Sequence, residues 1–286
     1  MASHLTTRIG IAAVLIPAAV GALWLGGWPL AVVIAALGVL GAREVFDLAR
    51  KQSIEPLVEL GYAAAAVIPL ATYAAQRAEP TWGAGPWYAG VLWLLALLGA
   101  AMYTRGPKGR PLTAVSVTAF GTLYASAPLA FLIAIRHGGN SARQPVAYLL
   151  LALFPLVLTW ICDTAAYSAG SQFGGAKMAP VLSPRKTWSG AAGGLAGALV
   201  FAVALGLLVL NRFGWQFDVW QLLGIGLVVG VLGQVGDIAE SLLKREAGVK
   251  DSSDLIPGHG GVLDRLDSLY FVIPATAVLL LLYGVI

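Results

Sequence analysis

Two polar stretches interrupt an otherwise apolar chain, and the second carries half of its acidic residues. The segment 237–267, DIAESLLKREAGVKDSSDLIPGHGGVLDRLD, holds seven of the fourteen Asp and Glu residues. Residues spaced i, i+3, i+4 and i+7 share one helix face, and this spacing joins Asp237, Glu240, Ser241 and Lys244. The i, i+3, i+4 spacing returns in Asp264, Asp267 and Ser268, at the predicted start of the last helix. A solvated amphipathic linker with intrahelical ion pairs is the ordinary interpretation.

A metal and phosphate site is the alternative interpretation of this segment. Asp237 and Asp264 stand at the edges of apolar runs, and a charge near mid-membrane costs roughly 2.5–3.5 kcal/mol. Carboxylates kept there are expected to be paired or to hold a cation. Oxygen ligands favour Mg²⁺, and a hard divalent ion beside Lys and Arg favours a polyphosphate. Zinc is disfavoured, because the chain has one cysteine and three dispersed histidines.

The turn PGHGG within this segment has two interpretations. His259 could act as an acid or base, or it could cap a helix or anchor the turn. Gly260 and Gly261 allow positive φ angles or a close approach of backbone to a ligand.

The first polar stretch runs from WICDTAAYSAGSQFGGAK to LSPRKTWSG. Asp163 stands inside an apolar run with Tyr167 one turn later, which indicates function, although a structural hydrogen bond to a neighbouring helix would also explain it. The glycines before Lys177 lack the spacing of a P-loop. The run Ser183 to Thr187 places hydroxyls and cations at a predicted helix start, where they favour an anion site.

The elements that must position these residues are membrane helices. The chain is 58% hydrophobic and 11% charged, with a mean hydropathy of +0.81, and such a composition indicates an integral membrane protein. Spanning the hydrocarbon takes about 20 mainly apolar residues as helix. Nine runs qualify, at about 9–27, 28–42, 56–75, 87–103, 112–135, 146–169, 190–211, 219–236 and 268–286. The fold class is therefore all-α and polytopic, and the first run is expected to be a retained helix rather than a signal peptide.

The distribution of cations predicts the orientation. With a cytoplasmic N-terminus and nine helices, fourteen of the eighteen Lys and Arg residues fall in inside segments and four in outside segments. Because Lys and Arg are enriched in cytoplasmic loops, this excess supports the assumed orientation. Both polar stretches then form cytoplasmic loops, at about 163–189 and 237–267. The C-terminus then lies on the opposite side. Anionic headgroups explain the basic inner face, so no nucleic-acid partner is inferred. No linker separates soluble domains, which predicts one membrane domain over 1–286, with a scaffold to about 135 and a catalytic half from about 146.

The segment SLLKREAGVKDSSDLIPGHGGVLDRLDS resembles the signature of the phosphatidate cytidylyltransferase family, also called CDP-diacylglycerol synthase. CDTAAYSAG and SPRKTWSG are similar to further elements of that family, and GAREVFDL, placed after the second helix, is weakly similar. The sequence departs from the family pattern at Arg185, where lysine is usual, and at Ser189, where glutamate is usual.

The resemblance implies transfer of a cytidylyl group from CTP to phosphatidic acid, with Mg²⁺ required and a second cation left open. It implies a metal site of Asp237 and Asp264, to which we add Asp163 and Asp251 as neighbours. We expect developing phosphate charge to be stabilised by Lys244, Arg245, Lys250 and Arg265. Substrate contacts are expected from Lys177, Ser183, Lys186, Thr187, Ser241, His259, Gly260, Gly261 and Asp267. We expect the protein to lie in a bacterial inner membrane, surrounded by membrane lipids, and a homodimer is one assembly that the sequence allows.

Two rivals remain open at this point. A CTP-dependent lipid kinase would transfer the γ-phosphate and release CDP. A transporter would use the intramembrane carboxylates to carry a cation, and it predicts broken helices in an inverted repeat, which the sequence does not display.

Overall fold

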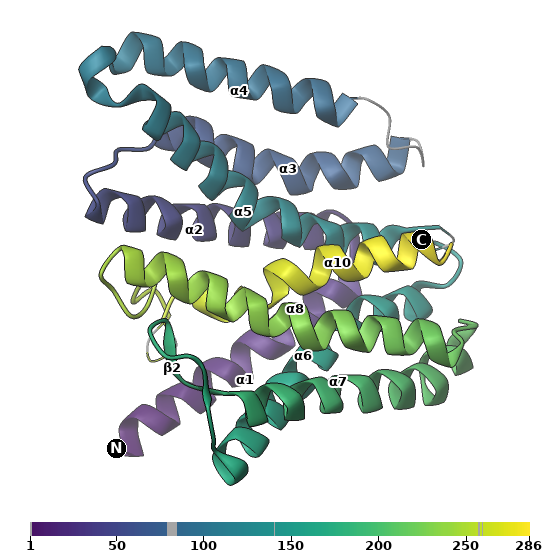
Figure 1. Cartoon of the computed structure of the whole chain (residues 1–286). Helices are drawn as coiled ribbons and strands as arrows, with labels where there is room; N and C mark the ends of the chain where they lie inside the picture. Colours follow the sequence, from purple (N-terminus) through teal and green to yellow (C-terminus); the bar gives the residue numbers. More distant parts are fainter. Residues whose placement is uncertain (1, 79–84, 140, 257, 259) are drawn as a thin grey trace. The chain divides into compact units, whose positions relative to one another are not determined.

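The computed structural model describes residues 2–78, 85–139, 141–256, 258 and 260–286, and it describes their side chains except those of 2–12, 15 and 78. The chain is almost entirely helical (Figure 1). Its elements are α1 Ala2–Leu25, α2 Gly27–Lys51, α3 Val58–Ala78, α4 Gly85–Thr104, η1 Pro107–Gly109, α5 Pro111–His137, α6 Pro145–Phe173, β1 Lys177–Ala179, β2 Ser183–Thr187, α7 Trp188–Leu208, η2 Leu210–Phe213, α8 Val219–Glu246, α9 Leu263–Leu266 and α10 Leu269–Leu282.

Eight helical segments among the described residues are long and apolar enough to cross a membrane. They match the second to ninth predicted spans, so the prediction of an all-α polytopic membrane protein is confirmed. The first predicted span falls on α1, where side chains are described only from residue 13 onward with a gap at 15, and it stays a prediction. The second span was predicted too short, because α2 continues to Lys51 beyond the apolar run and so contains the whole GAREVFDL element.

The chain divides into two compact units, Met1–Ile133 with Glu246–Arg265, and Ala134–Arg245 with Leu266–Ile286. In the first unit, hydroxyls on α5 bind the backbone of α3 and of the residue just before it. Ser126 Oγ donates to the carbonyl of Ala65 at 2.6 Å, and Thr118 Oγ1 accepts from the amide of Leu57 at 2.8 Å. Such bonds between neighbouring helices hold membrane helices together where lipid offers no hydrophobic drive.

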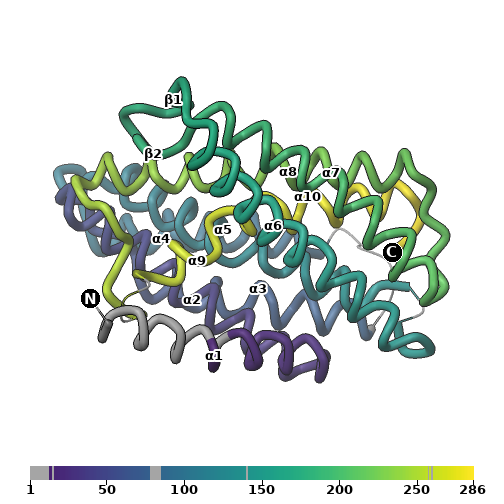
Figure 2. Tube along the Cα trace, turned by 90° about the horizontal axis from the view of Figure 1, so that it is seen from below, coloured from purple at the N-terminus to yellow at the C-terminus, as the bar shows by residue number. Residues whose placement is uncertain are grey.

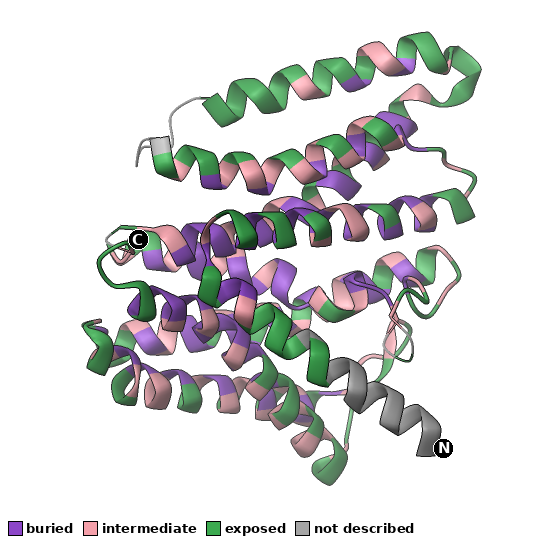
Figure 3. Ribbon diagram, turned by 180° about the vertical axis from the view of Figure 1, so that it is seen from behind, coloured by how far each residue is buried: buried purple, intermediate pink, exposed green. Residues whose placement is uncertain are grey.

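Helix α4 of the first unit is largely exposed. Its buried residues are Leu97 and Ala101, which pack with Leu57 and Val115, while most of its remaining surface is exposed (Figure 3). An apolar helix with so little burial is suited to contact with lipid.

The second unit is built on a close helix pair. Small residues of α7 face α6: a Cβ added at Gly197 would lie 2.7 Å from Ala165 Cβ, and one at Gly194 would lie 3.0 Å from the carbonyl of Cys162. Small residues let helix backbones approach each other. Helix α8 runs beside α7 (Figures 1 and 2), and Gln234 Nε2 on α8 donates to the carbonyl of Ala191 on α7 at 3.1 Å.

A short antiparallel hairpin, β1–β2, joins α6 to α7 and extends past their ends (Figure 2). The sequence predicted a helix start at Ser183, but residues Ser183–Thr187 form strand β2 and the helix begins at Trp188. The last predicted span is also different in detail. A break at Asp267 and Ser268 separates the four-residue helix α9 from α10, so these residues do not continue one regular helix with Asp264.

Candidate active site

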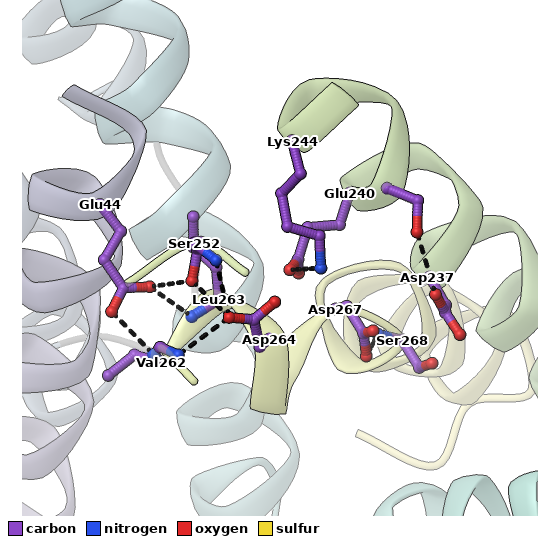
Figure 4. A network of polar contacts seen from close by, with 12 residues as sticks. Glu44, Asp237, Glu240, Lys244, Ser252, Val262, Leu263, Asp264, Asp267 and Ser268 are labelled. Carbon is purple, nitrogen blue, oxygen red and sulfur yellow. Dashed lines mark hydrogen bonds and ion pairs between the residues drawn. The ribbon is translucent and has the colours of Figure 1, made fainter. Parts of the chain in front are cut away.

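The first unit holds the loop between α8 and α9 against α2 through one buried carboxylate, that of Glu44. This side chain is 2% exposed. Its Oε1 accepts hydrogen bonds from Ser253 Oγ at 2.7 Å and from the amide of Val262 at 2.9 Å. Its Oε2 accepts from Ser252 Oγ at 2.9 Å and from the amide of Leu263 at 2.8 Å. Four donors replace the water that burial removes from this acid (Figure 4).

The Asp264 carboxylate belongs to the same hydrogen-bond network. Its Oδ2 accepts from the amide of Ser252 at 2.8 Å and from the amide of Gly261 at 2.9 Å. The Ser252 Oγ also lies 2.8 Å from this oxygen, so Asp264 and Glu44 share the single proton of that hydroxyl. The turn is closed by the amide of Ile256, which donates to the carbonyl of Gly260 at 2.8 Å. The loop therefore fixes the orientation of one predicted metal ligand before any ligand binds.

The glycine pair is required by this packing. Gly260 has a φ of +79°, and a Cβ there would also lie 2.6 Å from Asp264 Oδ2. At Gly261 a Cβ would overlap Ser252 Oγ and Glu44 Oε2. The positive φ that the sequence predicted as one use of these glycines is present at Gly260, and the groups that their backbone approaches within the protein are two carboxylates and a hydroxyl. Contact of these glycines with a nucleotide stays a prediction.

In the second unit Asp237 on α8 is paired with Lys186, the residue before the last one of β2. Lys186 Nζ lies 2.7 Å from Asp237 Oδ2, and it is 3.4 Å from the carbonyl of Gln234. Ser241 Oγ donates to Asp237 Oδ1 at 3.5 Å. The contact between Asp237 and Ser241 confirms the predicted helix face. Through Lys186, the β1–β2 hairpin contacts the same Asp237 carboxylate.

One turn further along α8, Glu240 and Lys244 form a buried ion pair. Glu240 is fully buried and Lys244 is 8% exposed, and Lys244 Nζ donates to Glu240 Oε1 at 2.9 Å. The sequence placed both on one helix face but assigned a role only to the lysine. In the structure this ammonium serves first as the counterion of a buried acid.

Two more carboxylates of the second unit lie near Asp237. Asp163 on α6 interacts electrostatically with Asp237 and Lys186, and Asp267 interacts with Asp237, Asp163 and Lys244. Within the described part of the chain, no three His, Cys, Asp or Glu side chains are arranged to hold one metal ion by themselves. The second unit thus gathers several acids together with two lysines, Lys186 and Lys244.

The hairpin residues divide between structural and exposed positions. Thr187 is the N-cap of α7, since its Oγ1 accepts from the amide of Gly190 at 3.1 Å. Ser189 Oγ donates to the carbonyl of Gly174 and lies 3.0 Å from Thr187 Oγ1. The hydroxyl that replaces the usual glutamate thus ties the end of α6 to the start of α7. Lys177 is exposed and Ser183 is half-buried.

The remaining predicted residues are located as follows. Arg245 of the second unit and Lys250, Asp251 and Arg265 of the first unit are exposed. His259 lies outside the described residues. Asp264 belongs to the first unit, whereas Asp237, Asp163 and Asp267 belong to the second, so the predicted pairing of Asp237 with Asp264 as metal ligands stays a prediction.

Sequence reasoning missed Glu44 and Ser252 as site residues. Two features of the sequence could have indicated them. Glu44 is an acid in GAREVFDL, the segment with weak resemblance to the family, and Ser252 and Ser253 are adjacent serines before the glycine turn. Nothing in the local pattern links them, because 208 positions separate Glu44 from Ser252.

The chain is similar to a known protein family and to several bacterial proteins named phosphatidate cytidylyltransferase. The model of the cytidylyltransferase family matches residues 6–283. The phosphatidate cytidylyltransferase of Haemophilus influenzae is 38% identical over 185 residues, 64% of this chain and 63% of that protein. Those of Staphylococcus aureus and Brucella suis are 43% identical over 129 residues and 46% identical over 134 residues. These alignments cover 45% and 47% of this chain, and 48% and 46% of the two relatives.

The chain thus spans about half the length of most of the curated relatives it matches. The match to the family's model is broader, because it covers nearly every residue from the first helix to the last. The protein belongs to the cytidylyltransferase family.

Proposed function

We propose that the protein transfers the cytidylyl group of CTP to phosphatidic acid, giving CDP-diacylglycerol and pyrophosphate for phospholipid biosynthesis. The observation that carries this proposal is the family match over residues 6–283, joined to the name phosphatidate cytidylyltransferase that the bacterial relatives bear. The two substrates, and a homodimer as one assembly, belong to the same proposal.

We place the protein in the bacterial inner membrane with its active face toward the cytoplasm. The excess of Lys and Arg in the predicted inside segments supports this orientation. CTP is a cytosolic nucleotide and the lipid phosphate lies at the headgroup plane, so a cytoplasmic site at the ends of helices could reach both.

In the proposed reaction an oxygen of the lipid phosphate attacks the α-phosphorus of CTP. A new P–O bond forms, the bond from that phosphorus to the oxygen bridging the β-phosphate breaks, and pyrophosphate leaves with the electron pair. A phosphate monoester is already an anionic nucleophile near neutral pH, so the chemistry requires no protein base. His259 is therefore not needed as a general base.

Cationic side chains of the protein would bind the phosphates and stabilise the charge that develops. Lys177, Arg245, Lys250 and Arg265 are exposed, so ligand phosphates could reach them without a rearrangement of the core. Lys244 is different, because it is buried against Glu240; its role in the proposal is to keep α8 intact beside Asp237.

The donor set fits a magnesium ion. Asp163, Asp237 and Asp267 offer carboxylate oxygens, the ligands that Mg²⁺ prefers, and the ion is commonly held by one or two carboxylates together with substrate phosphates rather than by an all-protein cage. When bound, Mg²⁺ would neutralise the triphosphate. Asp237 is our first candidate ligand in the second unit, and Asp264 stays the candidate in the first. A second cation remains part of the proposal.

The test uses the detergent-purified full chain with labelled CTP, phosphatidic acid and Mg²⁺, and mass spectrometry of both products. We expect CDP-diacylglycerol and pyrophosphate from the wild type, loss of product for Asp237→Asn and Asp264→Asn, and loss on removal of Mg²⁺ with EDTA. Asp218→Asn is the matched control at the other end of α8, because asparagine preserves its hydrogen bond to the amide of Gln221.

Each rival has its own signature in the same experiment. Release of CDP with a newly phosphorylated lipid would replace the proposal by a lipid kinase. Nucleotide-independent uptake of ²⁸Mg by proteoliposomes, without any lipid product, would replace it by a transporter.

A further inference from the structure

The buried Glu44 carboxylate accepts hydrogen bonds from both sides of the glycine turn. Its four donors come from residues 252, 253, 262 and 263, which flank both sides of the turn that contains Gly260 and Gly261. A carboxylate has about four acceptor positions, so these donors saturate it. Glu44 is also buried, and it therefore acts on bound substrate only through its neighbours.

The neighbour that matters is Ser252. Its hydroxyl lies 2.9 Å from Glu44 Oε2 and 2.8 Å from Asp264 Oδ2, and its amide donates to the same Asp264 oxygen. On the other side of the turn, Glu44 holds the amide of Leu263, the residue next to Asp264. Asp264 is thus fixed from two directions by groups that Glu44 holds.

We infer that Glu44 is a positioning residue for Asp264, acting through Ser252 and the backbone at Leu263. The inference rests on the proposed function where it concerns turnover. Glu44 binds neither substrate: it sets the direction of the Asp264 carboxylate and the shape of the glycine turn. The filled space at Gly261, where even a Cβ would overlap Ser252 and Glu44, leaves the two acids little freedom to move apart.

Glu44→Gln is the main perturbation. The amide has nearly the same size, but its NH₂ group would face two of the four donors, so both the loop and Asp264 lose their fixed geometry. Partners that orient a catalytic ligand typically contribute about 10–100-fold in affinity or activity, and we expect a drop of this size in kcat/KM. Glu59→Gln, the same change at an exposed glutamate of α3, is the matched control and should keep the wild-type value.

Two serine variants separate positioning from simple attachment. Ser252 and Ser253 each donate one hydroxyl to Glu44, but only Ser252 also contacts Asp264. Ser252→Ala should therefore lower kcat/KM at least about tenfold more than Ser253→Ala. In the Glu44→Gln background, Ser252→Ala should add little, because the path it interrupts is already broken. Equal effects of the two serine variants, or full additivity with Glu44→Gln, would overturn the inference.

A second readout does not depend on activity. The amides of Ser252 and Gly261 donate to Asp264, whereas those of Val262 and Leu263 donate to Glu44 itself. Hydrogen exchange measured at the individual amides of Ser252 and Gly261 therefore reports whether the Asp264 carboxylate keeps its position. We expect faster exchange in Glu44→Gln and unchanged exchange in Glu59→Gln; unchanged exchange in Glu44→Gln would refute the positioning role. If the wild type makes no CDP-diacylglycerol, the proposed function fails, while the exchange comparison still decides the role of Glu44.

Discussion

Removal of the Lys244 ammonium should destabilise the protein strongly. Glu240 is fully buried and its Oε1 lies 2.9 Å from Lys244 Nζ, so Lys244→Met removes a paired ammonium from a carboxylate shielded from water. Breaking a buried ion pair in this way costs about 3–5 kcal/mol. At about 2–4 °C per kcal/mol for a chain of roughly this size, the midpoint of thermal unfolding should fall by roughly 6–20 °C.

The assay is thermal unfolding in one detergent, followed by tryptophan fluorescence. Lys250→Met makes the same change at an exposed position and should stay within about 0.5 kcal/mol of the wild type. The double variant Glu240→Leu/Lys244→Met removes both charges and should recover most of the loss, because apolar residues can replace a buried pair at little cost. A wild-type midpoint for Lys244→Met, or a double variant no more stable than the single one, would refute this reasoning.

Three further substitutions test individual contacts. Thr187→Ala removes the N-cap of α7 and should lower the free energy of unfolding by about 1 kcal/mol, measured by thermal unfolding. Thr187→Ser retains the cap and serves as the control. A loss of CTP binding without a loss of stability would contradict the capping role. Gly261→Ala should abolish product formation, because its Cβ would overlap Ser252 Oγ of the loop and Glu44 Oε2 of α2. Gly99→Ala on α4 should behave as the wild type, because among the described residues no atom outside the backbone of its own helix lies within 4 Å of the added Cβ. Gly197→Val should lower the unfolding midpoint by wedging α7 away from Ala165 on α6, and an unchanged midpoint would argue against the close helix pair.

The helices were predictable because lipid imposes a minimum apolar length on every span. The same criterion misjudged α2, since a hydropathy run ends where charged residues begin, while the backbone hydrogen bonds of the helix continue through Arg43, Glu44 and Asp47 to Lys51. The strand at Ser183–Thr187 was missed for a related reason. Its residues suit a helix start, and only the pairing with Lys177–Ala179 across the turn makes them extended.

Within the candidate site, the contacts predicted from spacing were those along one helix. Asp237 and Ser241, and likewise Glu240 and Lys244, are four residues apart on α8, and both pairs are in contact. The pairing of Asp237 with Lys186 joins two elements, and that of Glu44 with Ser252 joins two distant parts of the chain. Such contacts depend on how elements pack in three dimensions, which periodicity does not encode.

The separation of Glu44 from its partners also has a consequence during biosynthesis. At about 5–20 residues per second, a ribosome needs roughly 10–40 s to travel the 208 positions from Glu44 to Ser252. Throughout this interval α2 has been synthesised, yet the carboxylate has none of its four donors. The first unit is completed by the segment Glu246–Arg265, so it cannot mature as an N-terminal domain ahead of the rest. Until that segment has been synthesised, the Glu44 carboxylate lacks the four donors that satisfy it in the folded protein.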